Sequence, residues 1–319
     1  MRYRPIGVLA GACLLATSLH AQQRRTIALT FDDLPANTML GPGAYDGILN
    51  PIIQELADAQ VPAYGFVNEA KLYESNRPEL ARVKLLERWL DAGLALGNHG
   101  YQHLDLHTTP VADYLADIDR GSAVTSDLLY QRGGELEFFR HPMLHTGRSV
   151  AIRDSVTAHL SGTGMRVAPV TIDNQEWIFA RAYERALACE SPKAALDVAS
   201  LYFTYMDTVT GYYEAQARAI VGYEIPQVLL LHANQLNADH LDRLLSVYRK
   251  RGYRFIQLNE ALEDPAYSRP DTFTGAGGIT WLHRWALTDG KRGDFFAGEP
   301  GVPTPVQALY DEAGASTQC

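Results

Sequence analysis

Cysteine is scarce in this chain, which has only Cys13, Cys189 and Cys319 among its 319 residues. In an oxidising compartment Cys189 and Cys319 can form one disulfide or stay free thiols, and the sequence does not choose between the two. Long apolar runs are lacking as well. The longest, from Ile6 to Leu19, falls short of the roughly 20 residues that a membrane-spanning helix needs, so we expect no stable membrane insertion.

This first apolar run is typical of an export signal. Arg2 and Arg4 give it a positive start, and Leu19-His20-Ala21 is a plausible cleavage site. The sequence therefore predicts a signal peptide over residues 1–21 and a periplasmic or secreted protein.

Positive charge is also in short supply. Beyond residue 21 the chain keeps 26 basic side chains against 37 acidic ones, a formal net charge of −11. Such a surface has no electrostatic attraction for nucleic acid or for anionic lipid. Nucleic acid is therefore not an expected partner, and the sequence says nothing about the oligomeric state.

Apolar, β-rich runs alternate with segments of helical periodicity along most of the chain. The pattern predicts strands at 26–31, 63–67, 94–97, 138–139, 165–172, 227–231 and 255–258. It predicts helices at 45–59, 78–92, 110–130, 150–160, 175–222 with a break at Ser191-Pro192, and 237–250. Thr109 and Pro110 are expected to form the N-cap and first turn of the third helix. Seven strands separated by helices imply an α/β fold with a mainly parallel sheet.

The composition changes after about residue 265. We expect a signal peptide at 1–21, a catalytic domain at 22–265 and a C-terminal extension at 266–319. The extension is expected to pack on the barrel and to end in a partly irregular tail that is rich in glycine and proline. Trp281 and Trp285, four residues apart, fit a helix face packed on the barrel better than a stacking surface for sugar rings.

Polar clusters stand at the carboxyl ends of the predicted strands. They are Asp32-Asp33, His99 with His103, Arg140, Asp173 with Glu176-Trp177, and His232. Open α/β sheets and α/β barrels place their sites at this end of the strands. These side chains are the types that a metal-assisted hydrolase needs in its active site: two adjacent carboxylates, two histidines, an arginine and a further histidine late in the chain.

The first two clusters can hold a metal ion. Of the paired aspartates, one carboxylate can bind the ion and the other can transfer protons, although such a pair also caps helices and turns. His99 and His103 are four residues apart, a spacing that presents both rings on one face of a helical turn. His107 continues this spacing, but the strand end lies nearer His99, which favours His103. An aspartate–dihistidine set accepts Zn²⁺, Co²⁺ or Ni²⁺.

The later clusters can supply proton transfer and orientation. Arg140 stands where a strand stops at a proline, so it can hold Asp32 ionised and oriented, or form an ordinary surface ion pair. His232 ends the most apolar run of the chain. It can be a general acid, or a core histidine whose ring nitrogens both have hydrogen-bond partners. A carboxylate from Asp173 or Glu176 could orient it.

At these residues the chain resembles the polysaccharide deacetylase family, the NodB-like carbohydrate esterases that remove acetyl groups from chitin, peptidoglycan or xylan. The five motifs of that family match in order across residues 26–258. They are Thr30-Phe31-Asp32-Asp33, His99 with His103, Arg140 to Met143, Asp173 to Trp177, and Leu230-Leu231-His232. The resemblance implies a distorted (β/α)7 barrel of mainly parallel strands.

The resemblance also implies a role for each motif. Asp32 would be the general base and His232 the general acid, while a divalent ion, foremost Zn²⁺, would be bound by Asp33, His99 and His103. The remaining residues would orient these groups or contact substrate: Arg140, Glu176, Asp173, Met143 through its amide, Trp177 and Leu230. The implied reaction is hydrolysis of N-acetyl or O-acetyl groups on a glycan such as chitooligosaccharide or peptidoglycan.

Four positions depart from the family pattern. Leu34 replaces a glycine, Met143 an aromatic residue and Glu176 an aspartate, and Gly100 replaces a residue whose hydroxyl supports the ligand loop. None of the four removes a ligand, base or acid. Two alternatives stay open: the same fold hydrolysing a non-glycan amide or ester, and a non-catalytic glycan-binding protein, which would require loss of the base or the acid.

Overall fold

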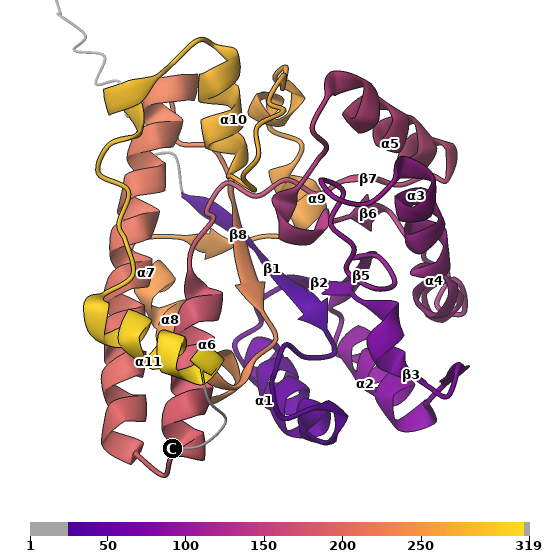
Figure 1. The fold of residues 1–319 in the computed structure, drawn as a ribbon, viewed down its shortest axis with the longest axis vertical. Coiled ribbons are helices and arrows are strands. Elements are labelled where there is room, and N and C mark those ends of the chain that lie inside the picture. Colours follow the sequence, from indigo (N-terminus) through magenta and orange to yellow (C-terminus); the bar gives the residue numbers. More distant parts are fainter. Residues whose placement is uncertain (1–24, 316–319) are drawn as a thin grey trace, which may run out of the picture.

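The computed structural model describes residues 25–315 (Figure 1). The predicted signal segment, residues 1–21, and Cys319 lie outside this range. Within it, helices surround one seven-stranded parallel sheet. Its strands are β1 (Thr26–Leu34), β2 (Ala63–Val67), β5 (Ala95–Asn98), β6 (Phe138–Phe139), β7 (Arg166–Val167), β8 (Gln227–His232) and β9 (Arg254–Phe255). A separate antiparallel pair comprises β3 (Tyr73–Glu74) and β4 (Arg77–Pro78).

The sheet curls into an incomplete barrel. Its strand order is β7-β6-β5-β2-β1-β8, and β9 pairs with the start of β1. The segment after β7 reaches across to β8, where Ile172 bridges Leu229 and the Thr171 N–H donates to the Val228 carbonyl at 3.0 Å. These contacts draw the two edges of the sheet together. The predicted distorted barrel of mainly parallel strands is therefore confirmed.

The register of β1 and β8 explains why polar residues meet at one edge. Both strands are buried on both faces, as their continuous apolar sequences predict. Thr30 pairs with Leu230, and Asp32 pairs with His232 at the carboxyl end. Because parallel strands in register end at the same level, these two polar side chains are delivered to the same place.

Most predicted helices are present. They are α1 (Tyr45–Asp58), α2 (Leu80–Asp91), α3 (Val111–Arg120), α4 (Ala123–Tyr130), α5 (Val150–Gly162), α6 (Glu176–Ala188), α7 (Pro192–Val221), α8 (Gln235–Lys250), α9 (Leu258–Ala261), α10 (Trp281–Thr288) and α11 (Thr304–Ala315). Over residues 25–315, no helix combines the length and apolar character needed to cross a membrane.

The predicted long helix over 110–130 is wrong in two details. It is divided into α3 and α4 at Gly121, where a Cβ atom would lie 2.5 Å from the backbone of Gly100. This close approach fixes a glycine there and ends the first helix. The N-cap of α3 is Pro110 rather than Thr109, and no side chain bonds to the free N–H groups.

The C-terminal extension packs against the barrel. The Trp281 N–H donates to the Val170 carbonyl at 2.8 Å, and the Thr280 hydroxyl donates to the Thr171 carbonyl at 2.8 Å. Trp281 and Trp285 are more than nine-tenths buried, which confirms their interpretation as core residues. Helix α11, yellow in Figure 1, packs on α6 in the part of the extension where the composition indicated an irregular tail.

Candidate active site

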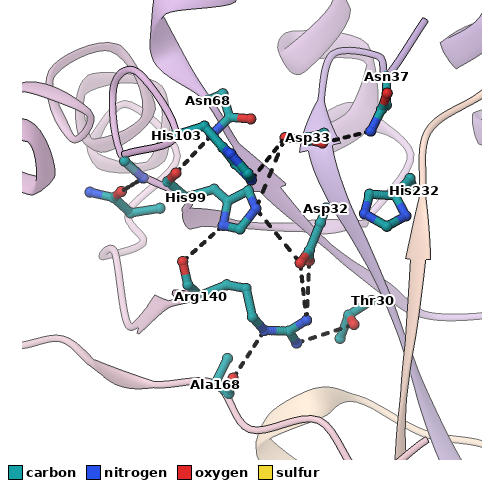
Figure 2. Close-up of polar contacts among 12 residues, drawn as sticks. Thr30, Asp32, Asp33, Asn37, Asn68, His99, His103, Arg140, Ala168 and His232 are labelled. Carbon is teal, nitrogen blue, oxygen red and sulfur yellow. Dashed lines mark hydrogen bonds and ion pairs between the residues drawn. The ribbon is translucent and has the colours of Figure 1, made fainter. Parts of the chain in front are cut away.

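The predicted site residues converge at the carboxyl edge of the sheet, where Asp32 and Asp33 lie among His99, His103 and His232 (Figure 2). They line a cavity of about 440 Å³. Its lining residues are Asp32, Asp33, Asn37, His99, His103, Met143, Leu144, Asp173, Asn174, Gln175, Trp177, Leu230, His232 and Gly278. The two other predicted residues, Arg140 and Glu176, are fully buried and bond to Asp32 and His232. The structure thus brings together every residue that the sequence analysis selected.

Asp33, His99 and His103 form the candidate metal centre. The Asp33 Oδ1 atom lies 4.0 Å from Nε2 of His99 and 3.8 Å from Nε2 of His103. Around tetrahedral zinc, bonds of about 2.0–2.2 Å place ligand atoms roughly 3.4 Å apart. Small movements of these side chains would therefore complete the coordination. One carboxylate and two imidazoles are a donor set that fits Zn²⁺, Co²⁺ or Ni²⁺.

His99 has one ring nitrogen free for a metal. Its Nδ1 lies 2.8 Å from the carbonyl oxygen of Arg140, so Nδ1 carries the proton and Nε2 keeps its lone pair. Burial, followed by the charge of His103, lowers the pKa of His99 well below its ordinary value. The neutral, ligating form therefore dominates. The Asn68 side chain fixes the backbone by donating to the His99 carbonyl at 2.7 Å.

Asp33 is kept ionised by Lys71, a residue that the sequence analysis did not select, and by His103. Burial acts to raise its pKa, but the charge of Lys71 and then that of His103 outweigh burial, so the pKa lies below the ordinary value. The Lys71 ammonium donates to the Asp33 carbonyl at 2.9 Å and lies 3.5 Å from Oδ1. The Asn37 amide donates to Oδ2 at 2.7 Å. Oδ1 is left facing the two histidines.

The expected helical turn carrying His99 and His103 is wrong, because residues 99–103 form a loop. The N–H groups of Tyr101 and Gln102 donate to the Asp117 carboxylate at 2.9 and 3.0 Å, which replaces helical bonding. A Cβ atom on Gly100 would lie 2.6 Å from that carboxylate. Asp117 therefore supports the ligand loop, and a glycine at position 100 leaves room for it.

Asp32 is held by an arginine with no exposure to solvent. Nη1 of Arg140 donates to both Asp32 oxygens at 3.1 and 3.3 Å, and Nη2 donates to the Thr30 hydroxyl at 3.2 Å. The Ala168 carbonyl accepts from Nε at 3.0 Å. Burial raises the pKa of Asp32 above its ordinary value, and the Arg140 charge opposes this rise. The predicted partnership of Arg140 with Asp32 is present, inside the protein rather than on its surface.

His232 is paired with Glu176 rather than with Asp173. Its Nδ1 lies 2.7 Å from Glu176 Oε2, while Oε1 accepts from the Asn237 amide at 2.7 Å and from the Asn234 amide. Burial acts to lower the pKa of His232, but the Glu176 charge outweighs it and raises the pKa to about 9. Asp173 lines the cavity, and burial raises its pKa to about 7.

Met143 lines the cavity from a short turn. It lies in the short 3-10 helix η3 (Pro142–Leu144), with φ of 55°. The neighbouring N–H groups of Leu144 and His145 donate to carbonyls within this turn, whereas over residues 25–315 the Met143 N–H has no such bond. Gly278 of the extension packs on this turn, since a Cβ atom there would lie 1.8 Å from the Met143 carbonyl oxygen. The extension therefore forms part of the cavity wall.

Four residues that line the cavity have left-handed backbone conformations, with φ of 68° at Asp33, 57° at His103, 55° at Met143 and 54° at Leu144. A residue with a side chain is strained there by about 1–3 kcal/mol. For Asp33, the bonds from Asn37 and Lys71 help to hold this conformation. Strain of this kind is concentrated at functional sites.

His107 belongs to a different group of side chains. Its ring stacks on that of His145 with centroids 3.9 Å apart, and Asp105 lies 2.7 Å from Nδ1 of His145. The ligand atoms of this second group also lie within 4.8 Å of one another. His141 is buried, with its Nδ1 2.9 Å from the hydroxyl of Tyr114. His103, and not His107, is thus the histidine that accompanies Asp33.

Residues 20–161 match the family model described as polysaccharide deacetylase. This match covers 142 of the chain's 319 residues, and it supports the resemblance to the polysaccharide deacetylase family. The match supports an activity on acetyl groups of glycans. Among curated proteins, none matches this chain.

The chain is also similar to solved structures at low identity. The peptidoglycan deacetylase PdaC from Bacillus subtilis is 20% identical, with 76% of this chain and 91% of that chain covered and a TM-score of 0.47. A family 4 carbohydrate esterase from Streptomyces lividans, in complex with acetate, is 18% identical over 74% of this chain and 95% of that chain, with a TM-score of 0.47. BA3943 from Bacillus anthracis, a CE4 family pseudoenzyme, is 15% identical over 75% and 66%, with a TM-score of 0.47.

Proposed function

We propose that this chain is a metal-dependent hydrolase that removes N-acetyl or O-acetyl groups from a glycan such as chitooligosaccharide or peptidoglycan. One observation carries the proposal. Asp32 and His232 share a cavity with the ligand set Asp33, His99 and His103. Burial raises the pKa of the Asp32 carboxyl, and the Glu176 charge raises that of the His232 imidazole. The combination supplies a base, an acid and a metal centre within one site.

Asp33, His99 and His103 would hold the ion, most simply Zn²⁺, with Co²⁺ or Ni²⁺ as alternatives. A bound dication there lowers the pKa of water and polarises the acetyl carbonyl. His99 is neutral and Asp33 ionised, which are the protonation states that ligation requires.

Asp32 is the proposed general base. Its Oδ2 lies 3.7 Å from Nε2 of His99, so it stands beside the ligand set without belonging to it. The carboxylate takes a proton from the attacking water, whose oxygen bonds to the acetyl carbon. Arg140 holds both oxygens of Asp32 in place, which keeps the base oriented while the proton moves.

His232 is the proposed general acid. With a pKa of about 9, its ring is protonated at neutral pH and can donate that proton to the leaving amine or alkoxide as the bond to the acetyl group breaks. The Glu176 carboxylate accepts from Nδ1 behind the ring and stabilises the imidazolium. The Met143 N–H is the proposed donor to the oxyanion that forms on the acetyl carbonyl.

We further propose that the protein acts outside the cytoplasm, in the periplasm or after secretion. The support is the signal-like sequence of residues 1–21. Acetylated cell-wall and environmental glycans are found in those compartments, which agrees with the proposed substrate class.

Replacing Asp32 by Asn tests the proposal. The variant should release acetate from acetylated chitooligosaccharide at least about a hundredfold more slowly, while its zinc content stays equal to that of the wild type. Acetate release and metal content are measured on the same preparations. Near-normal turnover in the variant would remove Asp32 as the base.

The substrate class is tested by comparing acetate release from chitooligosaccharide, peptidoglycan and acetylated xylan with hydrolysis of small non-glycan amides and esters. The proposal expects the glycans to give the higher kcat/KM. Preference for the small compounds would favour the alternative hydrolase. Glycan binding with no hydrolysis by the metal-loaded wild type would support a non-catalytic binding protein.

A further inference from the structure

A second cavity adjoins the candidate active site. Its volume is about 480 Å³, within the range of small-molecule sites. Asn37 and Trp177 line both cavities, so the two share a wall. The lining residues come from the loop after β1, from α6, from Asn234 at the start of α8 and from α11 of the C-terminal extension. The second cavity is therefore an extension of the site in which this chain's own C-terminal helix takes part.

Two aromatic rings stand at the junction of the cavities. Trp177 is 42% exposed, an unusual state for a large apolar side chain. Its indole meets the ring of Tyr310 edge to face, with centroids 5.4 Å apart at 82°. The contact fixes both rings while leaving part of the indole open to the cavities. A flat apolar surface held in this way suits the C–H face of a sugar ring.

Polar groups surround these rings. Glu184 is 5% exposed and lines the cavity; its Oε2 accepts from the Met39 N–H at 3.1 Å, while Oε1 has no hydrogen-bond partner within residues 25–315. Arg181 and Asp311 line the same cavity from α6 and α11. A buried carboxylate with spare accepting capacity favours a ligand that brings hydroxyl or N–H donors.

From these observations we propose that the second cavity binds a further sugar ring of the same glycan chain whose acetyl group is hydrolysed in the first cavity. The ring lies with its apolar face toward Trp177 and Tyr310 and with its hydroxyl groups toward the polar lining that includes Glu184. This inference rests on the proposed function and makes it more specific: the substrate is an oligosaccharide or polymer, and a residue of the C-terminal extension selects for it.

The test is the dependence of kcat/KM on substrate length, measured by acetate release from chitooligosaccharides of two to six sugars. For the wild type, kcat/KM should rise with length. Replacing Tyr310 by Ala should lower the ratio of kcat/KM between the six-sugar and two-sugar substrates about tenfold, mainly through KM. Tyr130, which is 81% exposed on α4, offers the matched control, and Tyr130→Ala should keep the wild-type ratio.

A second variant and a binding measurement distinguish the loss of a sugar contact from misfolding of the Tyr310→Ala variant. Glu184→Gln keeps the size of the side chain and an acceptor for the Met39 N–H, and it should lower the same ratio. In the Asp32→Asn background, calorimetry should show weaker six-sugar binding when Tyr310→Ala is added. Equal kcat/KM at all lengths, or unchanged ratios and binding in both variants, would overturn the inference and leave the proposed function intact. No acetate release at any length would overturn the proposed function itself.

Discussion

His232 shows how one buried carboxylate sets the chemistry of a residue that the chain places at a strand end. Burial alone would lower its pKa, since an apolar surrounding disfavours the imidazolium. The Glu176 charge and the hydrogen bond at 2.7 Å reverse this and raise the pKa to about 9. Asn234 and Asn237 in turn hold the other carboxylate oxygen. The proposed acid thus depends on a neighbour that never contacts substrate.

Replacing Glu176 by Gln removes this charge and should shift the pH dependence of acetate release. A general acid works only while protonated, so kcat/KM falls as the pH rises through the pKa of His232. Without the carboxylate that pKa falls, and the alkaline limb of the kcat/KM profile should move by about one pH unit or more toward acid. Glu135→Gln, at an exposed position, is the control and should not move it. An unshifted alkaline limb in Glu176→Gln would contradict the assignment of His232.

At the scale of single residues, the sequence predicted the candidate metal ligands and the candidate base and acid. Asp32, Asp33, His99, His103 and His232 were found because each stands beside a strand end, where a fold of this class gathers its polar groups. The sequence also predicted Arg140 and Glu176, which hold Asp32 and His232, but it did not predict the residues that support the ligand set. Lys71, Asn37, Asn68 and Asp117 act from loops and helices that no local pattern connects to the site. For Asp117, the sequence signal is the glycine at position 100, because a side chain there would collide with the Asp117 carboxylate.

Among the elements, α7 is joined to the strands by a buried ion network. Glu214, 3% exposed, accepts from Arg251 at 2.8 and 3.1 Å, from the Tyr253 hydroxyl at 3.0 Å and from Arg25 at 3.2 Å. Arg25 precedes β1, and the two other donors precede β9. One carboxylate therefore fixes a helix to the starts of two neighbouring strands.

Replacing Glu214 by Ala should lower the free energy of unfolding by about 3–5 kcal/mol, because it leaves the partly buried Arg251 charge without its main partner. Asp197 offers a contrast on the same helix, where it makes an exposed pair with Lys193 at 2.5 Å. Asp197→Ala should change stability by less than about 0.5 kcal/mol. Urea unfolding of both variants gives the comparison. Similar small losses would show that the network does not stabilise the fold.

The periodicity of the sequence predicted most elements, because apolar runs are local signals. It missed features that depend on distant contacts. The division between α3 and α4 comes from the packing of Gly121 on Gly100, and the ligand loop is irregular because Asp117 takes its N–H groups. Neither contact can be inferred from spacing along the chain.

At the scale of the whole molecule, the C-terminal extension belongs to the site. Gly278 packs on the turn that carries Met143, and α11 lines the second cavity beside Trp177. The sequence predicted that the extension packs on the barrel, since two tryptophans four residues apart indicated a buried helix face. It did not predict where α11 lies, because a Gly- and Pro-rich composition carries no information about docking.

The central claim is that distant segments of one chain form a single metal centre from Asp33, His99 and His103. The most direct test is zinc binding to protein stripped of metal by a chelator, measured by calorimetry for the wild type, His103→Ala and His107→Ala. We predict one tightly bound ion in the wild type and in His107→Ala, and an affinity at least about a hundredfold weaker in His103→Ala. Unchanged zinc affinity in His103→Ala would contradict the account.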